Sequence, residues 1–161
     1  MRPRGTHLLS LDKMAGRIYP TPQDAEAAFY EALERSDLEA MMSVWAEDEE
    51  DIVCVHPSGA RLTGQEQVRE SWRQIFARAP AMRVSITQQV TLSAAMLSIH
   101  SVHESFSLPD DPRAQGLVVA TNVYVRTAAG WRMIVHHASP APAGSEAPAV
   151  AAAGQAPKTL H

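Results

Sequence analysis

Cysteine is almost absent from this sequence. Cys54 is the only one, so the chain cannot form an intrachain disulfide and is compatible with a reducing compartment. The only residue near Cys54 in the sequence that could lower the pKa of its thiol is His56, so a nucleophilic role for Cys54 is not expected. We therefore predict that Cys54 is a small core residue and that the protein is cytoplasmic.

Long apolar runs and clusters of positive charge are also missing. No segment approaches the roughly 18 apolar residues that a membrane span requires, and Asp12 and Lys13 interrupt the basic start before a signal-peptide core can form. The 14 Lys and Arg residues are scattered and are outnumbered by 18 Asp and Glu residues, for a net charge of -4. The sequence therefore predicts a soluble protein with neither a membrane nor a nucleic-acid partner.

Three stretches within residues 21–79 carry helix-start signals. Residues 21–24, Thr-Pro-Gln-Asp, combine an N-cap, a proline at the first helical position and an acid in the first turn. Residues 36–39, Ser-Asp-Leu-Glu, and 63–66, Thr-Gly-Gln-Glu, both have the form of a capping box. Each signal precedes apolar residues at helical spacing, so we predict three amphipathic helices.

From residue 82 onward the apolar period changes to two, which is typical of strands. The predicted strands span 82–92, 95–107, 115–127 and 130–139, after a short one at 52–55. Helices followed by a meander of strands indicate an α+β fold, in which three N-terminal helices pack on a strongly curved antiparallel sheet that forms a cone with an internal cavity. The predicted domain spans 21–140, between an N-terminal arm, 1–20, and a disordered Ala/Pro-rich tail, 141–161.

The last predicted strand, 130–139, has an apolar face that ends in polar side chains. Because Arg132 is best left in water, the opposite face is the expected interior. The apolar side chains on that face are Trp131, Met133 and Val135. Continued alternation sends His137 and Ser139 inward as well, where they form a satisfied core network or line a pocket.

His136 and His137 are adjacent and point to opposite faces of a strand, so they cannot both chelate one metal ion. We therefore predict a site with no metal and no cofactor. The alternative that the spacing leaves open is a three-histidine site formed by His56, His103 and His137.

Several short motifs together resemble the SnoaL-like branch of the nuclear transport factor 2-like superfamily. The motifs are Phe29-Tyr30, Ser36-Asp37-Leu38-Glu39, Trp45, His56-Pro57-Ser58-Gly59, Thr63-Gly64, Ser71-Trp72, Thr121-Asn122-Val123-Tyr124, and Gly130-Trp131-Arg132 leading to His136-His137-Ala138-Ser139. The resemblance covers about residues 21–140. It implies a cone-shaped α+β fold and a homodimer, and it leaves the activity open because members include enzymes and assembly modules.

The ketosteroid isomerase relatives supply expectations for single residues. Their catalytic base lies just before a proline after the first strand, which is similar to the position of His56. Their oxyanion-hole tyrosine falls on Phe29, which has no hydroxyl, so that Tyr30 or Tyr124 would have to substitute. Their neutral carboxylic acid falls near Asn122, an amide that can donate to a ligand oxygen.

We therefore predict a small apolar or cyclic carbonyl-containing ligand and metal-free, isomerase- or lyase-like acid-base chemistry, with His56, Asn122 and His137 as catalytic residues. The predicted ligand contacts are Phe29, Trp45, Trp72, Phe76, Tyr124 and Glu104. The alternative reading makes His56 a turn residue, Asn122 a cross-strand partner, Glu104 a solvated carboxylate and the aromatic residues plain core.

The final His-x-Ser-Pro of the predicted domain also resembles the association domain of calcium/calmodulin-dependent kinases, which assembles subunits. A non-enzymatic ligand-binding or assembly module is therefore the alternative function. We also predict a homodimer, formed through the open face of the sheet, because strands 82–92 and 115–127 would otherwise be half exposed. A larger ring of subunits would instead favour the assembly module.

Overall fold

A computed structural model of the chain describes residues 16–47 and 51–145. Most of the predicted N-terminal arm and of the predicted tail therefore lies outside the described residues. The described chain has three helices and six strands, in the order α1-α2-β1-β2-α3-β3-β4-β5-β6. This confirms the predicted α+β class.

Helix α1 spans Pro22–Arg35 and begins at the predicted capping box. The Thr21 hydroxyl accepts a hydrogen bond from the Asp24 amide at 3.1 Å, and the Asp24 carboxylate accepts one from the Thr21 amide at 3.0 Å. Helices α2, Leu38–Val44, and α3, Gly64–Arg78, complete the set. Each helix buries one apolar stripe, as the periodicity predicted.

The other two predicted capping boxes do not form. Ser36 ends α1 instead, in the left-handed conformation with φ 51°, and Asp37 caps α2 by accepting a hydrogen bond from the Ala40 amide at 3.0 Å. Thr63 makes no side-chain cap bond, and its amide donates to Gln67 at 3.1 Å. A chain that must leave one helix and enter the next within two residues needs Ser36 for the turn, so Asp37 takes over the cap.

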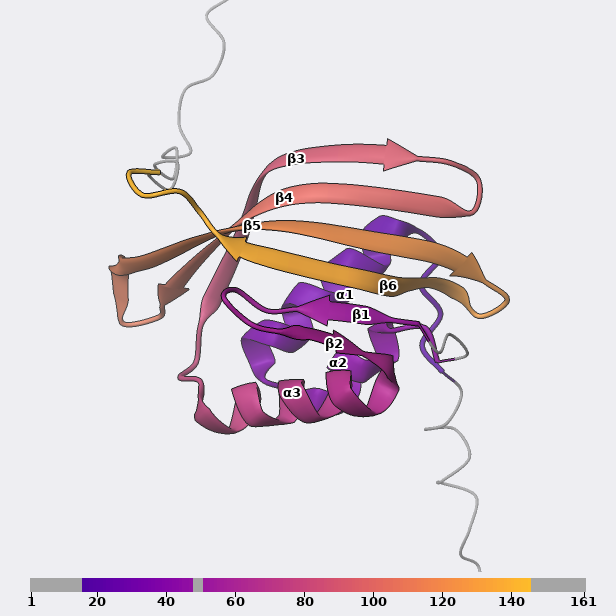
Figure 1. Ribbon diagram of the computed structural model, residues 1–161, viewed down its shortest axis with the longest axis horizontal. Helices are drawn as coiled ribbons and strands as arrows, with labels where there is room; N and C mark the ends of the chain where they lie inside the picture. Colours follow the sequence, from indigo (N-terminus) through magenta and orange to yellow (C-terminus); the bar gives the residue numbers. More distant parts are fainter. Residues whose placement is uncertain (1–15, 48–50, 146–161) are drawn as a thin grey trace, which may run out of the picture.

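The six strands form one sheet in the order β2-β1-β6-β5-β4-β3. They are β1 Val53–Val55, β2 Arg61–Thr63, β3 Arg83–Ser93, β4 Leu97–Leu108, β5 Asp111–Thr127 and β6 Gly130–Pro140. Neighbouring strands are antiparallel except for β1 and β6, which are parallel. Strand β2, which was not predicted, pairs with β1. Figure 1 shows the long strands β3–β6 curving over the helices.

A β-bulge in β6 overturns the predicted orientation of its second half. Tyr124 pairs with Met133 and Val123 pairs with Val135, so Ile134 has no partner on β5. One extra residue reverses the alternation. His136 is consequently buried, whereas His137 and Ser139 are exposed, and Val135 lies on the same outer face as they do. The predictions that Val135, His137 and Ser139 point inward were therefore wrong.

Arg132 is buried rather than left in water, which is a second correction. Its guanidinium donates to the carbonyl oxygen of Arg17 at 2.6 Å and to that of Trp131 at 2.9 Å, and lies 4.9 Å from the centre of the Tyr19 ring. The segment before α1 therefore covers the start of β6. Backbone acceptors and an aromatic face replace the water that the charge would otherwise require.

Candidate functional site

One cross-strand row brings three polar side chains and Cys54 to the concave face of the sheet. His100 on β4 pairs with Asn122 on β5, Asn122 pairs with His136 on β6, and His136 pairs with Cys54 on β1. Directly opposed residues share a face, and all four are 3% exposed or less. The bulge in β6 is what puts His136, rather than His137, into this row.

Asn122 connects the row to two groups that come from α1 and β4. Its Oδ1 atom lies 2.7 Å from Nδ1 of His136, and its Nδ2 atom donates to the Tyr30 hydroxyl at 2.9 Å. Tyr30 in turn donates to Oε1 of Glu104 at 2.7 Å. Because an amide oxygen only accepts, His136 carries its proton on Nδ1. Both ends of the Asn122 amide thus have protein partners.

Glu26 gathers the second half of the network. One of its carboxylate oxygens, Oε2, lies 2.8 Å from Nδ1 of His100 and 3.3 Å from the Tyr124 hydroxyl, while Oε1 accepts from Gln89 at 2.6 Å. His100 continues to Ser98 at 2.9 Å. Gln89 is exposed and lies within a register shift of β3, between Thr87 and Val90, from which its side chain reaches Glu26.

Burial shifts the pKa values of several side chains in this interior network. Desolvation raises the pKa of Glu104 to about 7, with a further push from Glu26, and the hydrogen bond from Tyr30 opposes the rise. Burial also raises the pKa of Tyr124 and that of Tyr30. Desolvation lowers the pKa of His136 to about 3, helped by the neighbouring His56 and His137. At neutral pH the His136 ring is therefore uncharged.

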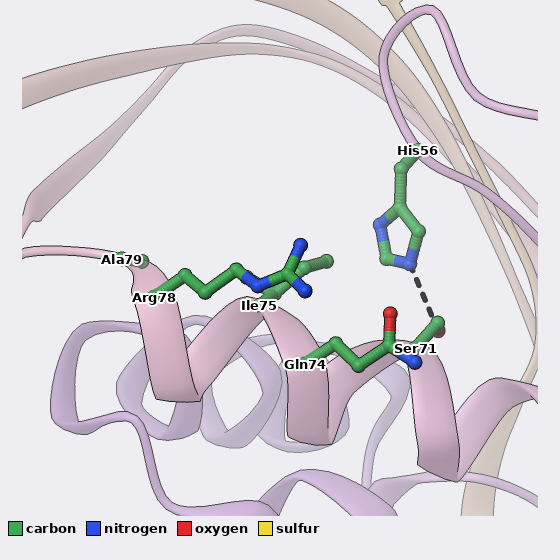
Figure 2. A pocket seen from close by; sticks show the side chains of 6 residues that line it. All are labelled: His56, Ser71, Gln74, Ile75, Arg78 and Ala79. Carbon is green, nitrogen blue, oxygen red and sulfur yellow. Dashed lines mark hydrogen bonds between the residues drawn. The ribbon is translucent and has the colours of Figure 1, made fainter.

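A cleft of about 460 Å³ opens beside α3, at the end of β1 (Figure 2). It is lined by His56, Ser71, Gln74, Ile75, Arg78 and Ala79. His56 follows β1 directly, and the other five residues come from the second half of α3 and the residue after it. The cleft therefore combines an imidazole, a guanidinium and an amide with an aliphatic floor, as ligand sites commonly do.

The hydrogen bonds of Ser71 determine which nitrogen of His56 carries a proton. The Ser71 hydroxyl donates to the Val68 carbonyl oxygen at 2.8 Å and lies 3.0 Å from Nε2 of His56. A hydroxyl has one proton, and with that proton on the Val68 carbonyl oxygen we assign the proton of the neutral His56 ring to Nε2, which donates to Ser71, and the lone pair to Nδ1. Figure 2 shows Nδ1 turned to the open side of the cleft. Burial lowers the pKa of His56, which keeps the ring neutral at pH 7.

Aromatic side chains separate the cleft from the interior network. The ring of Trp72 lies 4.7 Å from that of His56 and 6.3 Å from that of His136, between ring centres. Phe29 lies 5.7 Å from Trp72 and 4.9 Å from His136. The two histidines are therefore neighbours across an aromatic layer, and a proton on one disfavours a proton on the other.

The structure places the predicted site residues in three groups. His56 lines the cleft, and the half-buried Phe76 packs on Trp72 at 5.5 Å between ring centres. The fully or almost fully buried members are Phe29, Trp45, Trp72, Glu104, Asn122 and Tyr124. His137 is exposed on the opposite face, away from the others. The predicted catalytic trio of His56, Asn122 and His137 is thus not brought together.

Sequence reasoning assigned no site role to Glu26, His100, Ser71 or Arg78, although Ser71 belongs to one of the family motifs. A signal was present for Glu26, which stands four residues, about one helical turn, before Tyr30 in α1. The other three depend on strand register and on the direction of α3. Within residues 16–47 and 51–145, no three His, Cys, Asp or Glu side chains are grouped as a metal site would require. None of the described helices is long and apolar enough to cross a membrane.

Comparison with known proteins links this geometry to a family. The family model of the SnoaL-like domain matches residues 23–144. A putative calcium/calmodulin-dependent protein kinase type II association domain from Thiobacillus denitrificans is 40% identical, with a TM-score of 0.72, over 78% of this chain and 99% of that one. No curated protein matches the sequence significantly.

Two further solved structures share the fold. A putative dehydratase of the nuclear transport factor 2-like family from Streptomyces avermitilis is 34% identical, with a TM-score of 0.67, over 74% of this chain and 92% of that one. A putative ketosteroid isomerase from Parabacteroides distasonis is 20% identical, with a TM-score of 0.63, over 81% of this chain and 98% of that one, and at that identity it shows the fold alone.

Proposed function

This chain belongs to the SnoaL-like domain family of the nuclear transport factor 2-like superfamily, and on that premise we propose that it binds a small carbonyl compound in the cleft beside α3 and moves a proton on it. His56 is the base. The family contains isomerases and dehydratases, so proton transfer next to a carbonyl is a reaction that its cone supports.

The observation that carries this proposal is the neutral, oriented imidazole of His56. Its Nε2 atom donates to Ser71, its Nδ1 atom holds a lone pair toward the cleft, and burial keeps its pKa below the ordinary value of 6.5. A general base must be unprotonated at the working pH and must face the proton that it removes. His56 meets both conditions.

The proposed step breaks one C–H bond beside a carbonyl group of the ligand. The proton goes to Nδ1 of His56, and the electron pair moves into the carbonyl to form an enolate. Return of the proton to a different carbon completes an isomerisation, whereas departure of a hydroxyl from the next carbon, with the proton from His56, releases water and completes a dehydration. Each outcome restores neutral His56.

Asn122 enters this proposal through the interior network. Asn122 holds the Nδ1–H form of His136, which lies next to the aromatic layer behind His56. An oxyanion role for Asn122 requires it to exchange one of its present partners for a ligand oxygen, because its Nδ2 atom already donates to the Tyr30 hydroxyl at 2.9 Å and to Oε2 of Glu26 at 3.4 Å. We keep that role as a prediction for Asn122 and assign proton abstraction to His56.

Isomerisation of cyclohex-3-en-1-one tests the proposal, because the conjugated product absorbs in the ultraviolet and deuterium uptake from D₂O reports each proton abstraction. We expect His56→Gln to lower both rates by roughly 10²- to 10⁴-fold, the usual share of general acid-base catalysis. Arg61→Ala, at an exposed residue of β2, is the control and should change little. Full activity of a folded His56→Gln protein would refute the role of His56.

A second candidate function is self-assembly through the outer face of the sheet. Five apolar side chains form one cross-strand row there, next to the inward-facing polar row: Val53, Leu92, Ile99, Val123 and Val135. Adjacent rows point to opposite faces, so this one faces away from the helices. A second copy of the chain would cover it, and the similarity to an association domain supports this proposal.

A further inference from the structure

We propose that the ligand of the cleft beside α3 is an organic acid, whose carboxylate is bound by the guanidinium of Arg78 while its carbon skeleton lies toward Nδ1 of His56. The inference rests on the proposed function for the place of the reacting C–H bond. The binding of a carboxylate by Arg78 stands independently of it.

Arg78 differs from the other two arginines of α3 because, among the described residues, no carboxylate pairs with its guanidinium. Arg73 forms an ion pair with Glu70 at 2.6 Å, and Arg69 forms one with Glu39 of α2. Arg78 has Gln74 and Ile75 at the positions one turn earlier, where a carboxylate would pair with it. Within the part of the chain that the structure describes, no carboxylate lies within ion-pairing distance of Arg78.

The direction of the Arg78 side chain makes its charge available to a ligand. Figure 2 shows the guanidinium extending along α3 into the cleft, on the side that Nδ1 of His56 faces. A guanidinium offers several N–H donors in one plane and binds a carboxylate through two of them at once. The cleft therefore has a cation at one end and a neutral base at the other.

Gln74 determines the direction in which an acidic ligand lies in the cleft. Its Nε2 atom donates to Glu70 at 2.8 Å, and because a carboxylate only accepts, the amide oxygen is the end that remains for the cleft. Figure 2 shows this oxygen on the His56 side. Two acceptors, the Gln74 oxygen and Nδ1 of His56, would repel an anion there. The carboxylate therefore lies beside Arg78.

The apolar lining defines the rest of the ligand. Ile75 and Ala79 are half-buried and lie between the charged end and the helix surface, so a hydrocarbon ring or chain contacts them. This combination selects a keto acid with an apolar skeleton over a neutral ketone of the same shape. The chemical class is thus a small, apolar carboxylic acid with a carbonyl group.

The test compares 3-oxocyclohexanecarboxylate with its methyl ester, which has the same ring without the charge. Titrations of the full chain, followed by calorimetry at low and at high salt, give both dissociation constants. We expect the acid to bind about 10- to 100-fold more tightly than the ester at low salt, as for hydrogen bonds to a charged group, and less so at high salt.

Substitutions on α3 locate the effect. Arg78→Gln should remove the preference for the acid, Arg78→Lys should keep part of it, and Arg73→Gln, on the same helix but outside the cleft, should leave it unchanged. Circular dichroism confirms that each variant is folded. Equal binding of acid and ester, or a preference that persists in Arg78→Gln, would overturn the inference.

The two proposals fail in different ways. If His56-dependent deuterium uptake into cyclohex-3-en-1-one is present but acid and ester bind equally, the base stands and the carboxylate site is refuted. If the acid preference depends on Arg78 but no variant of His56 changes deuterium uptake, the carboxylate site stands and the catalytic proposal is refuted.

Discussion

Ser71 shows how a single hydroxyl can decide what a histidine does. With its proton assigned to the Val68 carbonyl oxygen, Ser71 accepts a hydrogen bond from His56. It therefore acts as a positioning residue for the base and is not itself a nucleophile. The same logic, one acceptor fixing one tautomer, applies to Asn122 and His136 in the interior.

Ser71→Ala should lower the rate of deuterium uptake by about 3- to 10-fold, because one hydrogen bond of roughly 0.5–1.5 kcal/mol no longer holds the His56 ring. The pH profile should shift along with the rate, since the Nε2 proton loses its partner. A merely structural role for Ser71 would lower stability without moving the pH profile, and that result would contradict the assignment.

Glu104 and His136 have opposite effects on stability. The folded chain keeps a proton on Glu104 up to a pKa of about 7, whereas the ordinary carboxyl loses it near 4.5, so this contribution to stability is lost as pH rises between those values. The folded chain excludes a proton from His136 down to a pKa of about 3, whereas the ordinary imidazole gains one near 6.5, so this contribution is lost as pH falls between those values. Between pH 4.5 and 6.5 the two nearly cancel.

Glu104→Gln should expose the effect of His136. The amide oxygen can still accept from Tyr30, but the opposing titration is gone. We expect the free energy of unfolding of the variant, relative to wild type, to fall by about 1 kcal/mol for each pH unit of acidification from 6.5 to 4.5. Urea denaturation at several pH values measures this. Parallel profiles for the two proteins would show that Glu104 is not perturbed by burial.

At the scale of elements, the sequence predicts helices and strands whose apolar residues recur regularly, but it does not predict a bulge that interrupts a strand. The three helices and the long strands were predicted from apolar periods of 3.6 and 2 and from the Thr21 cap. The bulge at Ile134 was not, because a bulge adds one residue without changing the composition of the strand. The interchange of His136 and His137 follows entirely from that residue.

The turn into β6 depends on Gly130. Its φ is +92°, and a Cβ atom there would lie 2.7 Å from the Tyr19 carbonyl oxygen, which accepts a hydrogen bond from the Trp131 amide. Gly130→Ala should therefore lower the free energy of unfolding by roughly 1–3 kcal/mol. Gly116→Ala, where a Cβ would meet nothing within 4 Å, is the matched control. Equal stability of the two variants would contradict this account.

For the whole molecule, the two faces of the sheet differ in character and correspond to the two proposed functions, ligand chemistry on the helix side and self-assembly on the outer side. Register alone places polar side chains toward the helices and the row of Val53, Leu92, Ile99, Val123 and Val135 outward. The family was identifiable from short motifs, whereas the contents of the cleft were not. Which side chain of α3 meets His56 depends on the angle at which the helix crosses the end of β1, and no local pattern encodes that angle.

Leu92→Lys tests the outer face as an assembly surface. Leu92 is 65% exposed in the single chain, so the substitution should leave the fold intact while it introduces a charge into the apolar row. We expect at least a 10-fold weaker self-association by analytical ultracentrifugation. Ile18→Lys, at a side chain that is 70% exposed but outside the row, is the control. A wild-type monomer at tens of micromolar, or equal dissociation of both variants, would contradict the proposal.

The central claim is that His56 presents an unprotonated Nδ1 to a ligand at neutral pH, and nitrogen NMR of the ¹⁵N-labelled chain measures this directly. Long-range ¹H–¹⁵N spectra, assigned with His56→Gln, should show a protonated Nε2 and a lone pair on Nδ1 near pH 7, with Nδ1 changing most when 3-oxocyclohexanecarboxylate is added. A charged ring at pH 7, or a proton on Nδ1 with the lone pair on Nε2, would contradict the claim.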